Sequence, residues 1–135
     1  MAARTATGES RARLARGFTL IELLVVMSII ATLLLIAVPR YFRSLERSRE
    51  VVLRQDLSVM RDAIDKYYAD LAQYPHELGS LVEKRYLRRI PVDPQTKSSD
   101  TWVTVASEDP DLPGIRDVHS GSKDLAADGT SFAEW

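Results

Sequence analysis

The sequence predicts an α+β protein in which one long N-terminal helix packs on a small antiparallel sheet. Three observations support this fold class. An apolar run without glycine or proline covers residues 18–38, an amphipathic pattern covers residues 41–72, and β-branched residues between turn signals follow in the C-terminal third. The chain has 135 residues, 45% hydrophobic and 27% charged, which suits one small domain with one additional element.

The apolar run from Phe18 to Val38 predicts a transmembrane helix. It has 21 residues, and as a helix it would be about 31 Å long, close to the hydrocarbon thickness of a bilayer. A cleaved secretory signal has a shorter apolar core of about 7 to 15 residues and a cleavage site of small residues. Ala37-Val38-Pro39 does not provide such a site. We therefore expect the run to span the membrane rather than to be removed.

Glu22 is the one ionisable residue of this run, and no Lys, Arg or His occurs between Gly17 and Arg40. An ionised carboxylate at the centre of a bilayer costs about 2.5 to 3.5 kcal/mol. Two interpretations are open. Glu22 lies one turn from the interface and reaches the headgroups, or it meets a cation that comes from outside the run.

The residues after the membrane segment predict the remaining elements in order. Apolar residues recur at steps of three and four along the amphipathic stretch: Leu57, Met60, Ile64, Tyr67, Tyr68 and Leu71. Tyr74-Pro75 closes this helix, since the residue before proline disfavours helical geometry. A short helix over 77–85, extended chain over 90–94, and strands over 101–105 and 115–119 follow, with a loop over 108–114 between the strands.

Composition and motif geometry argue against several classes of function. The chain has no cysteine, so disulfides, thiolate metal sites and cysteine catalysis are excluded. The formal net charge is −1, and no strongly basic face for nucleic acid is apparent. Asp117, His119 and Ser120 suggest a catalytic triad only superficially, because neighbouring strand residues point to opposite faces. We therefore expect neither an enzyme nor a nucleic-acid-binding protein.

The stretch Arg16-Gly17-Phe18-Thr19-Leu20-Ile21-Glu22, followed by an apolar helix and Pro39, resembles the type III signal of type IV pilins and type II secretion pseudopilins. The resemblance implies that a prepilin peptidase cuts between Gly17 and Phe18 and methylates the new amine of Phe18. It also implies that Glu22 pairs with that amine on a neighbouring copy during filament assembly. Pro39 would kink or locally open the helix at the membrane surface.

The later residues resemble one branch of this family, the major pseudopilins of type II secretion systems. The matching features are Tyr74-Pro75, Leu78 with Leu81, Ile90-Pro91-Val92-Asp93-Pro94, a tryptophan strand, Asp117-Val118 with Ser120-Gly121, Asp128-Gly129-Thr130 and Trp135. This resemblance implies a pilin-like roll. It also implies a calcium ion in the C-terminal loop, for which Asp124 and Asp128 are the candidate ligands.

The resulting expectation is a chain of three parts. Residues 1–17 form a cleaved basic leader, residues 18–38 a transmembrane and assembly helix, and residues 39–135 a periplasmic pilin-like domain. Arginines outnumber acids on both flanks of the helix, so charge alone does not set the topology. A cytoplasmic N-terminus before cleavage and a single pass through the bacterial inner membrane are therefore taken from the resemblance.

The function implied is that of a structural subunit of a periplasmic pseudopilus that helps drive protein export by type II secretion. Its partners would be copies of itself, other pseudopilins, the prepilin peptidase and the inner-membrane assembly platform. Two alternatives stay open. One is a type IV pilin for adhesion, motility or DNA uptake, and the other is a membrane-anchored binding module that does not polymerise.

Overall fold

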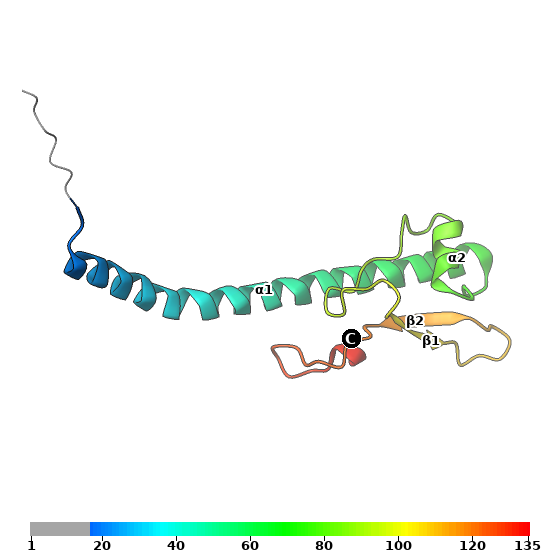
Figure 1. Ribbon diagram of the computed structural model, residues 1–135. Helices are drawn as coiled ribbons and strands as arrows, with labels where there is room; N and C mark the ends of the chain where they lie inside the picture. Colours follow the sequence, from blue (N-terminus) through cyan, green and yellow to red (C-terminus); the bar gives the residue numbers. More distant parts are fainter. Residues whose placement is uncertain (1–16) are drawn as a thin grey trace, which may run out of the picture. The chain divides into compact units, whose positions relative to one another are not determined.

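The computed structural model describes residues 17–135, so the predicted leader, apart from Gly17, lies outside the described residues. The predicted α+β class is confirmed (Figure 1). A 52-residue helix, α1 (Leu20–Leu71), is followed by a short helix, α2 (Leu78–Glu83), two strands, β1 (Val103–Ala106) and β2 (Ile115–His119), and a 3-10 helix, η1 (Phe132–Glu134). The chain divides between Pro39 and Arg40 into two compact units, which are described separately.

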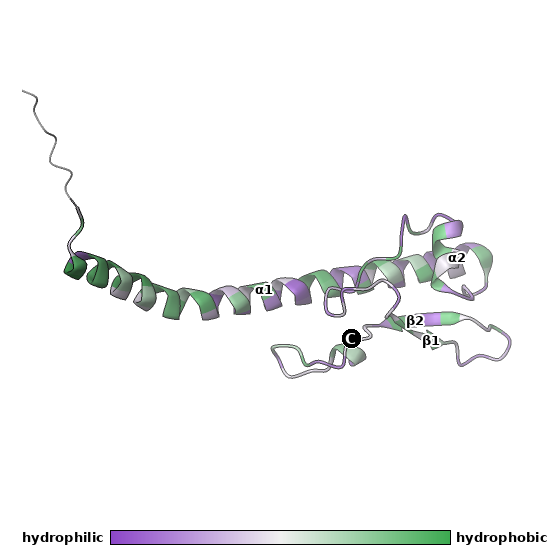
Figure 2. Cartoon of the chain, viewed as in Figure 1, coloured by the Kyte–Doolittle hydropathy of each residue, from purple (hydrophilic) through white to green (hydrophobic). Residues whose placement is uncertain are grey.

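The first unit is the N-terminal part of α1, and it is apolar on all sides (Figure 2). Its large hydrophobic side chains from Phe18 to Val38 are between 42% and 84% exposed. By length and composition, α1 is the one helix among residues 17–135 that could cross a membrane, and none of its most apolar stretch is buried. These side chains therefore need either lipid or another protein surface around them.

In the second unit, the rest of α1 supplies one face of the hydrophobic core. The residues of α1 that are buried are Leu53, Leu57, Met60, Ala63, Ile64 and Tyr67. Burying each large apolar side chain of this kind stabilises the fold by about 1.5 to 3 kcal/mol. Tyr68 and Leu71, the last two residues of the predicted apolar pattern, lie in α1 but are 36% and 39% exposed. Tyr68 instead stacks on Tyr74, with 4.6 Å between the ring centres.

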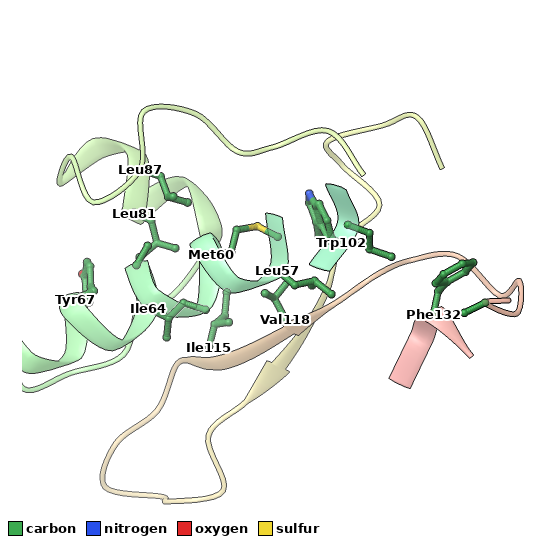
Figure 3. Close-up of a cluster of buried hydrophobic side chains, with 13 residues drawn as sticks. Leu57, Met60, Ile64, Tyr67, Leu81, Leu87, Trp102, Ile115, Val118 and Phe132 are labelled. Carbon is green, nitrogen blue, oxygen red and sulfur yellow. The ribbon is translucent and has the colours of Figure 1, made fainter. Parts of the chain in front are cut away.

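α2 and the sheet cover this face of α1 and complete the core (Figure 3). The side chains that pack on it from the rest of the chain are Leu81, Leu87, Trp102, Ile115, Val118, Ala126 and Phe132. β1 and β2 pair antiparallel, with a register shift between Val105 and Ala106. β2 has the predicted bounds, and α2 is shorter than predicted because Glu77 is extended and Arg85 has a φ of 64°.

Trp102 lies before β1 rather than inside it, which corrects the predicted start of this strand at Thr101. The Trp102 side chain is buried, and its indole N–H donates to the main-chain oxygen of Pro91 at 2.8 Å. A buried indole needs such a partner for its single polar group. Trp102 thus links the segment that contains Pro91 to the core, and it does not take part in the pairing between β1 and β2.

Arg61 links α1 to β2 and to the C-terminal segment. Its guanidinium donates to Asp117 Oδ1 at 2.7 Å, to the main-chain oxygen of Val118 at 3.0 Å and to that of Trp135 at 2.7 Å. Arg54, two turns earlier on α1, lies 4.1 Å from the centre of the Trp135 ring. We call Arg61, Asp117, Val118 and Trp135 the Arg61 network. It holds three acceptors in place with one planar donor group.

Asp117 gives up its charge at a lower pH than an ordinary aspartate does. Partial burial alone would raise the pKa of Asp117, but the hydrogen bonds from the Val118 N–H and from Arg61, together with the charges of Arg61 and His119, outweigh burial. The pKa of Asp117 therefore lies below its ordinary value. A carboxyl whose pKa is lowered by folding stabilises the fold above its unfolded pKa of about 3.9 and loses that contribution as the pH falls further.

Gly121 lies where its own backbone passes very close to the backbone of Thr101. A Cβ atom placed there would be 1.9 Å from the main-chain oxygen of Thr101 and 2.9 Å from its carbonyl carbon. Since both atoms belong to the backbone, no side-chain rotation can make room. The close approach lets Ser120 and Ser122, on either side of the glycine, lie buried.

Replacing Gly121 with Ala is expected to lower the free energy of unfolding by about 1 to 3 kcal/mol, because the backbone must shift to accept the methyl group. Gly79→Ala is the matched control. A Cβ at Gly79 would meet only the Glu77 side chain, at 3.6 Å, and in α2 alanine should stabilise by about 0.5 to 1 kcal/mol. Thermal unfolding of the full chain in detergent, followed by near-ultraviolet circular dichroism, checks this. Equal melting temperatures for the two variants would contradict the close approach.

Replacing Arg61 with Met is expected to cost about 1 to 2 kcal/mol at neutral pH, because three acceptors lose their donor. The loss of stability between about pH 5 and pH 3 should also become shallower, since the pKa of Asp117 is then no longer held down by Arg61. Arg116→Met is the control. The Arg116 guanidinium lies 3.8 Å from an exposed carboxylate, that of Glu108, and its loss should change stability by less than about 0.5 kcal/mol. Denaturant titrations at several pH values measure both effects, and parallel pH profiles for wild type and Arg61→Met would refute this role.

Candidate functional site

The predicted cleavage site lies in exposed, non-helical chain directly before α1. Gly17, Phe18 and Thr19 precede the helix, which begins at Leu20, and all three are exposed. Thr19 caps the helix, because its Oγ1 accepts the Glu22 N–H at 3.2 Å and its main-chain oxygen accepts the Leu23 N–H at 3.2 Å. The bond between Gly17 and Phe18 is therefore accessible and is followed within three residues by a fixed helix start.

Nothing in the described structure requires glycine at position 17. A Cβ atom there would meet no atom within 4 Å. This contrasts with Gly121, where the backbone itself forbids a side chain. The small residue at position 17 is thus not explained by packing within the described residues.

Glu22 lies in the first turn of α1, where a negative charge interacts favourably with the helix dipole. Within residues 17–135 its carboxylate has no ion-pair partner. Thr19 and Glu22 also have the spacing of a capping box, and the structure shows the half in which Thr19 Oγ1 accepts the Glu22 N–H. The sequence analysis missed this cap, although the threonine and the acid three residues later are visible in the sequence. The helix start therefore accommodates Glu22 but does not neutralise it.

The other polar side chains of the membrane segment are satisfied within their own helix. Ser28 Oγ donates to the Leu24 main-chain oxygen at 2.9 Å, and Thr32 Oγ1 donates to that of Ser28 at 2.8 Å. Such bonds remove the need for a partner in lipid. Glu22 consequently differs from Ser28 and Thr32, whose side-chain hydroxyls are hydrogen-bonded within the helix.

Pro39 lies inside α1, and the helix is unbroken from Leu20 to Leu71. It is also the last residue of the first compact unit. Its ring blocks one helical hydrogen bond, so it marks the position at which α1 has the least internal support. A role of Pro39 in assembly stays a prediction.

Asp124 and Asp128 are each occupied by donors of the protein. Asp128 Oδ1 accepts the side-chain hydroxyl of Thr130 at 2.6 Å and its N–H at 2.9 Å, and these bonds place the pKa of Asp128 below its ordinary value. Asp128 Oδ2 lies 3.8 Å from Arg54, and Asp124 Oδ2 accepts the Ser122 hydroxyl at 3.4 Å. Among residues 17–135 no group of three or more acidic or histidine side chains is arranged to hold a metal. Calcium binding at Asp124 and Asp128 stays a prediction.

The structure does not pair Ser120 with His119 as a catalytic triad would require. His119 Nε2 lies 3.7 Å from Asp117 Oδ2, but Ser120 Oγ donates to Asp93 Oδ2 at 2.6 Å. Asp93 is fully buried and also accepts the Gln95 N–H at 2.8 Å. The Ser120 hydroxyl is therefore hydrogen-bonded to Asp93, a buried carboxylate with a structural role. Sequence reasoning did not single out this pair, because Asp93 and Ser120 are 27 positions apart.

Comparison with known proteins agrees with this geometry. The model of the prokaryotic N-terminal methylation motif matches residues 12–38, a stretch that contains the exposed Gly17–Phe18 bond, Glu22 and the apolar part of α1. No solved structure matches the chain.

Several curated relatives carry one name, type II secretion system core protein G. The protein from Dickeya chrysanthemi is 32% identical over 95 residues, covering 58% of this chain and 62% of the relative. The one from Escherichia coli (strain K12) is 33% identical, covering 58% and 66%. This chain thus spans somewhat less than two thirds of these two relatives.

The protein from Klebsiella pneumoniae is 33% identical over 95 residues, and the match covers 58% of this chain and 68% of the relative. The predicted resemblance is therefore confirmed, both in the methylation motif at the start of α1 and in the residues beyond it. With its N-terminal methylation motif, its apolar helix and its α+β unit, the chain belongs to the family of type II secretion system core protein G, the pseudopilins.

Proposed function

We propose that this chain is a structural subunit, rather than an enzyme, of a periplasmic pseudopilus that helps drive protein export by type II secretion. Its membership of the core protein G family supports the secretion role. The observation that carries the proposal is Glu22, a carboxylate without an ion-pair partner in residues 17–135, at the start of a helix whose apolar side chains are uncovered. Both features become favourable when copies of the chain pack side by side.

Processing is the first step of the proposed function. A prepilin peptidase cuts the exposed bond between Gly17 and Phe18 and methylates the amine of Phe18. The cut creates a cation at the very start of the helix, and the methyl group leaves its positive charge in place. The match of residues 12–38 to the methylation motif supports this step.

Assembly then pairs the Glu22 carboxylate of one copy with the Phe18 amine of its neighbour. Removing one partner from a buried ion pair costs about 3 to 5 kcal/mol, so a copy in the wrong axial position is strongly disfavoured. The apolar surface of residues 18–38 supplies the contact area. The pair sets the register between copies, as single polar groups do in other helical assemblies.

The location follows from the same steps. Residues 18–38 cross the bacterial inner membrane once, with the N-terminus cytoplasmic before cleavage, and residues 39–135 form the periplasmic domain. The partners are copies of this chain, other pseudopilins, the prepilin peptidase and the inner-membrane assembly platform. The length and apolar surface of the N-terminal part of α1 support the membrane placement.

Protein isolated from membranes is expected to begin with a methylated Phe18, because the exposed bond before it lies within the methylation motif. Mass spectrometry of the N-terminal fragment measures this directly. Gly17→Val should leave the leader attached without changing the fold, since a side chain at position 17 meets nothing nearby. Wild-type protein that still begins at Met1 would overturn the processing step.

Replacing Glu22 with Ala is expected to reduce multimers captured by cross-linking in membranes about a hundredfold or more, because the neighbour's amine loses its counter-charge. Membrane insertion should persist, since Ala is cheaper in lipid than an acid. Ser28→Ala is the matched control, because the Ser28 hydroxyl is already bonded within its own helix. We expect this variant to assemble within about twofold of wild type, because it removes no interaction between copies. A Glu22→Ala variant that multimerises normally would favour the membrane-anchored binding module instead.

A further inference from the structure

Three arginines form a stripe at the start of the second unit. Arg40, Arg43 and Arg47, with Ser44 among them, line one shallow groove on the surface of α1. Residues three and four apart lie on the same face of a helix, so these guanidinium groups are neighbours. The three arginines are exposed. We call these four residues the arginine stripe.

The charge of the arginine stripe is not neutralised within the described residues. The ion pairs formed among residues 17–135 involve Arg54, Arg61, Arg116 and His119. The two acids of the same stretch, Glu46 and Glu50, line a different pocket together with Asp124. Glu50 also accepts the Ala127 N–H at 2.7 Å. The acids are thus directed to the C-terminal segment, and the stripe is left as an uncompensated cationic surface.

The arginine stripe follows the apolar segment immediately along the chain. Arg40 is two residues beyond Val38, the end of the apolar run. Arg40 and Arg43 follow within about 8 Å of helix, and the headgroup layer on each side of a bilayer is about 5 to 8 Å thick. Figure 2 shows hydrophilic residues becoming frequent in α1 directly after its mostly apolar part. Connectivity alone therefore brings Arg40 and Arg43 to the level of the lipid headgroups, and Arg47 follows one helical turn after Arg43.

Aromatic residues accompany the stripe. Tyr41 and Phe42 are 64% and 57% exposed, and their rings meet edge to face at 5.8 Å. Exposed aromatic side chains next to a membrane-spanning helix are typical of the interface between lipid and water. They support placement of residues 40–47 at the membrane surface rather than in the core of the second unit.

The positive charge that follows the C-terminal end of the apolar segment is not explained by the usual charge bias of membrane helices. Membrane helices usually carry excess Lys and Arg on one flank, the cytoplasmic one. Here the residues from Arg40 to Arg54 include five arginines and two glutamates, so the second flank is cationic as well. Topology does not require these cations, and the core does not use Arg40, Arg43 or Arg47.

We propose that the arginine stripe binds the phosphate groups of anionic glycerophospholipids in the membrane leaflet from which α1 emerges. Guanidinium groups bind phosphate oxygens with two parallel hydrogen bonds, and the Ser44 hydroxyl adds a further donor. The bound lipids hold the end of the helix at a fixed depth in the membrane. This inference rests on the membrane placement in the proposed function, and it does not depend on processing or filament assembly.

The test is native mass spectrometry of the full chain, extracted as a monomer in mild detergent and exposed to equimolar phosphatidylglycerol and phosphatidylcholine. We expect wild type to retain phosphatidylglycerol preferentially. In Arg40→Gln/Arg43→Gln/Arg47→Gln the preference should fall by about fivefold for each arginine replaced. The control Arg85→Gln/Arg88→Gln/Arg89→Gln removes the same charge from three other exposed arginines and should keep the preference. Near-ultraviolet circular dichroism verifies that each variant is folded.

Further arms of the experiment separate the sources of negative charge. Inorganic phosphate added at the concentration of the lipid should leave the bound phosphatidylglycerol in place, whereas displacement would show a phosphate site instead and overturn the lipid proposal. Equal lipid retention by wild type and the stripe variant would also overturn it. A third outcome would overturn the proposal as well: the stripe variant loses cross-links between copies while its lipid retention is unchanged. The stripe would then bind a second copy of the chain rather than lipid. Since lipid is measured on monomers, failure here leaves the pseudopilus proposal intact.

Discussion

The uncovered apolar surface of the first half of α1 is the constraint on which the rest of the structure depends. Its side chains from Phe18 to Val38 have no cover within residues 17–135, and each square ångström of such surface in water costs about 25 cal/mol. The contribution of α1 to the core therefore comes from the later turns of the helix, beginning with Leu53. The thirteen residues from Arg40 to Val52 stay outside the core.

The polar side chains of α1 find their hydrogen-bond partners in different places in the two units. In the apolar part, Ser28 and Thr32 donate to main-chain oxygens of their own helix, whereas Glu22 has no ion-pair partner within residues 17–135. In the second unit, Arg61 reaches three acceptors on other elements, and together with the Val118 N–H it lowers the pKa of Asp117. One helix thus carries a charged group, Arg61, that is paired within the fold and another, Glu22, that has no ion-pair partner among the described residues.

Local patterns predicted most of the architecture and the motif at the start of α1. The apolar run, the buried positions from Leu57 to Tyr67 and the bounds of β2 follow from periodicity and composition. Other features depend on contacts between distant residues, which periodicity does not encode. Arg61 lies outside the apolar pattern of the helix, yet it bonds to residues 56 to 74 positions away. α1 ends at Leu71, before Tyr74-Pro75, because Ala72 adopts a φ of 53°, although alanine is the best helix former.

The span of the contacts on α1 also sets an order of events during biosynthesis. Arg61 and Trp135 are 74 residues apart, and Glu50 and Ala127 are 77 apart. At about 5 to 20 residues per second, the ribosome needs roughly 4 to 15 s to make such an interval. The membrane segment is therefore complete well before the residues that close the second unit exist. Until they arrive, the face of α1 around Leu57 is open to water, and a chaperone can reach it.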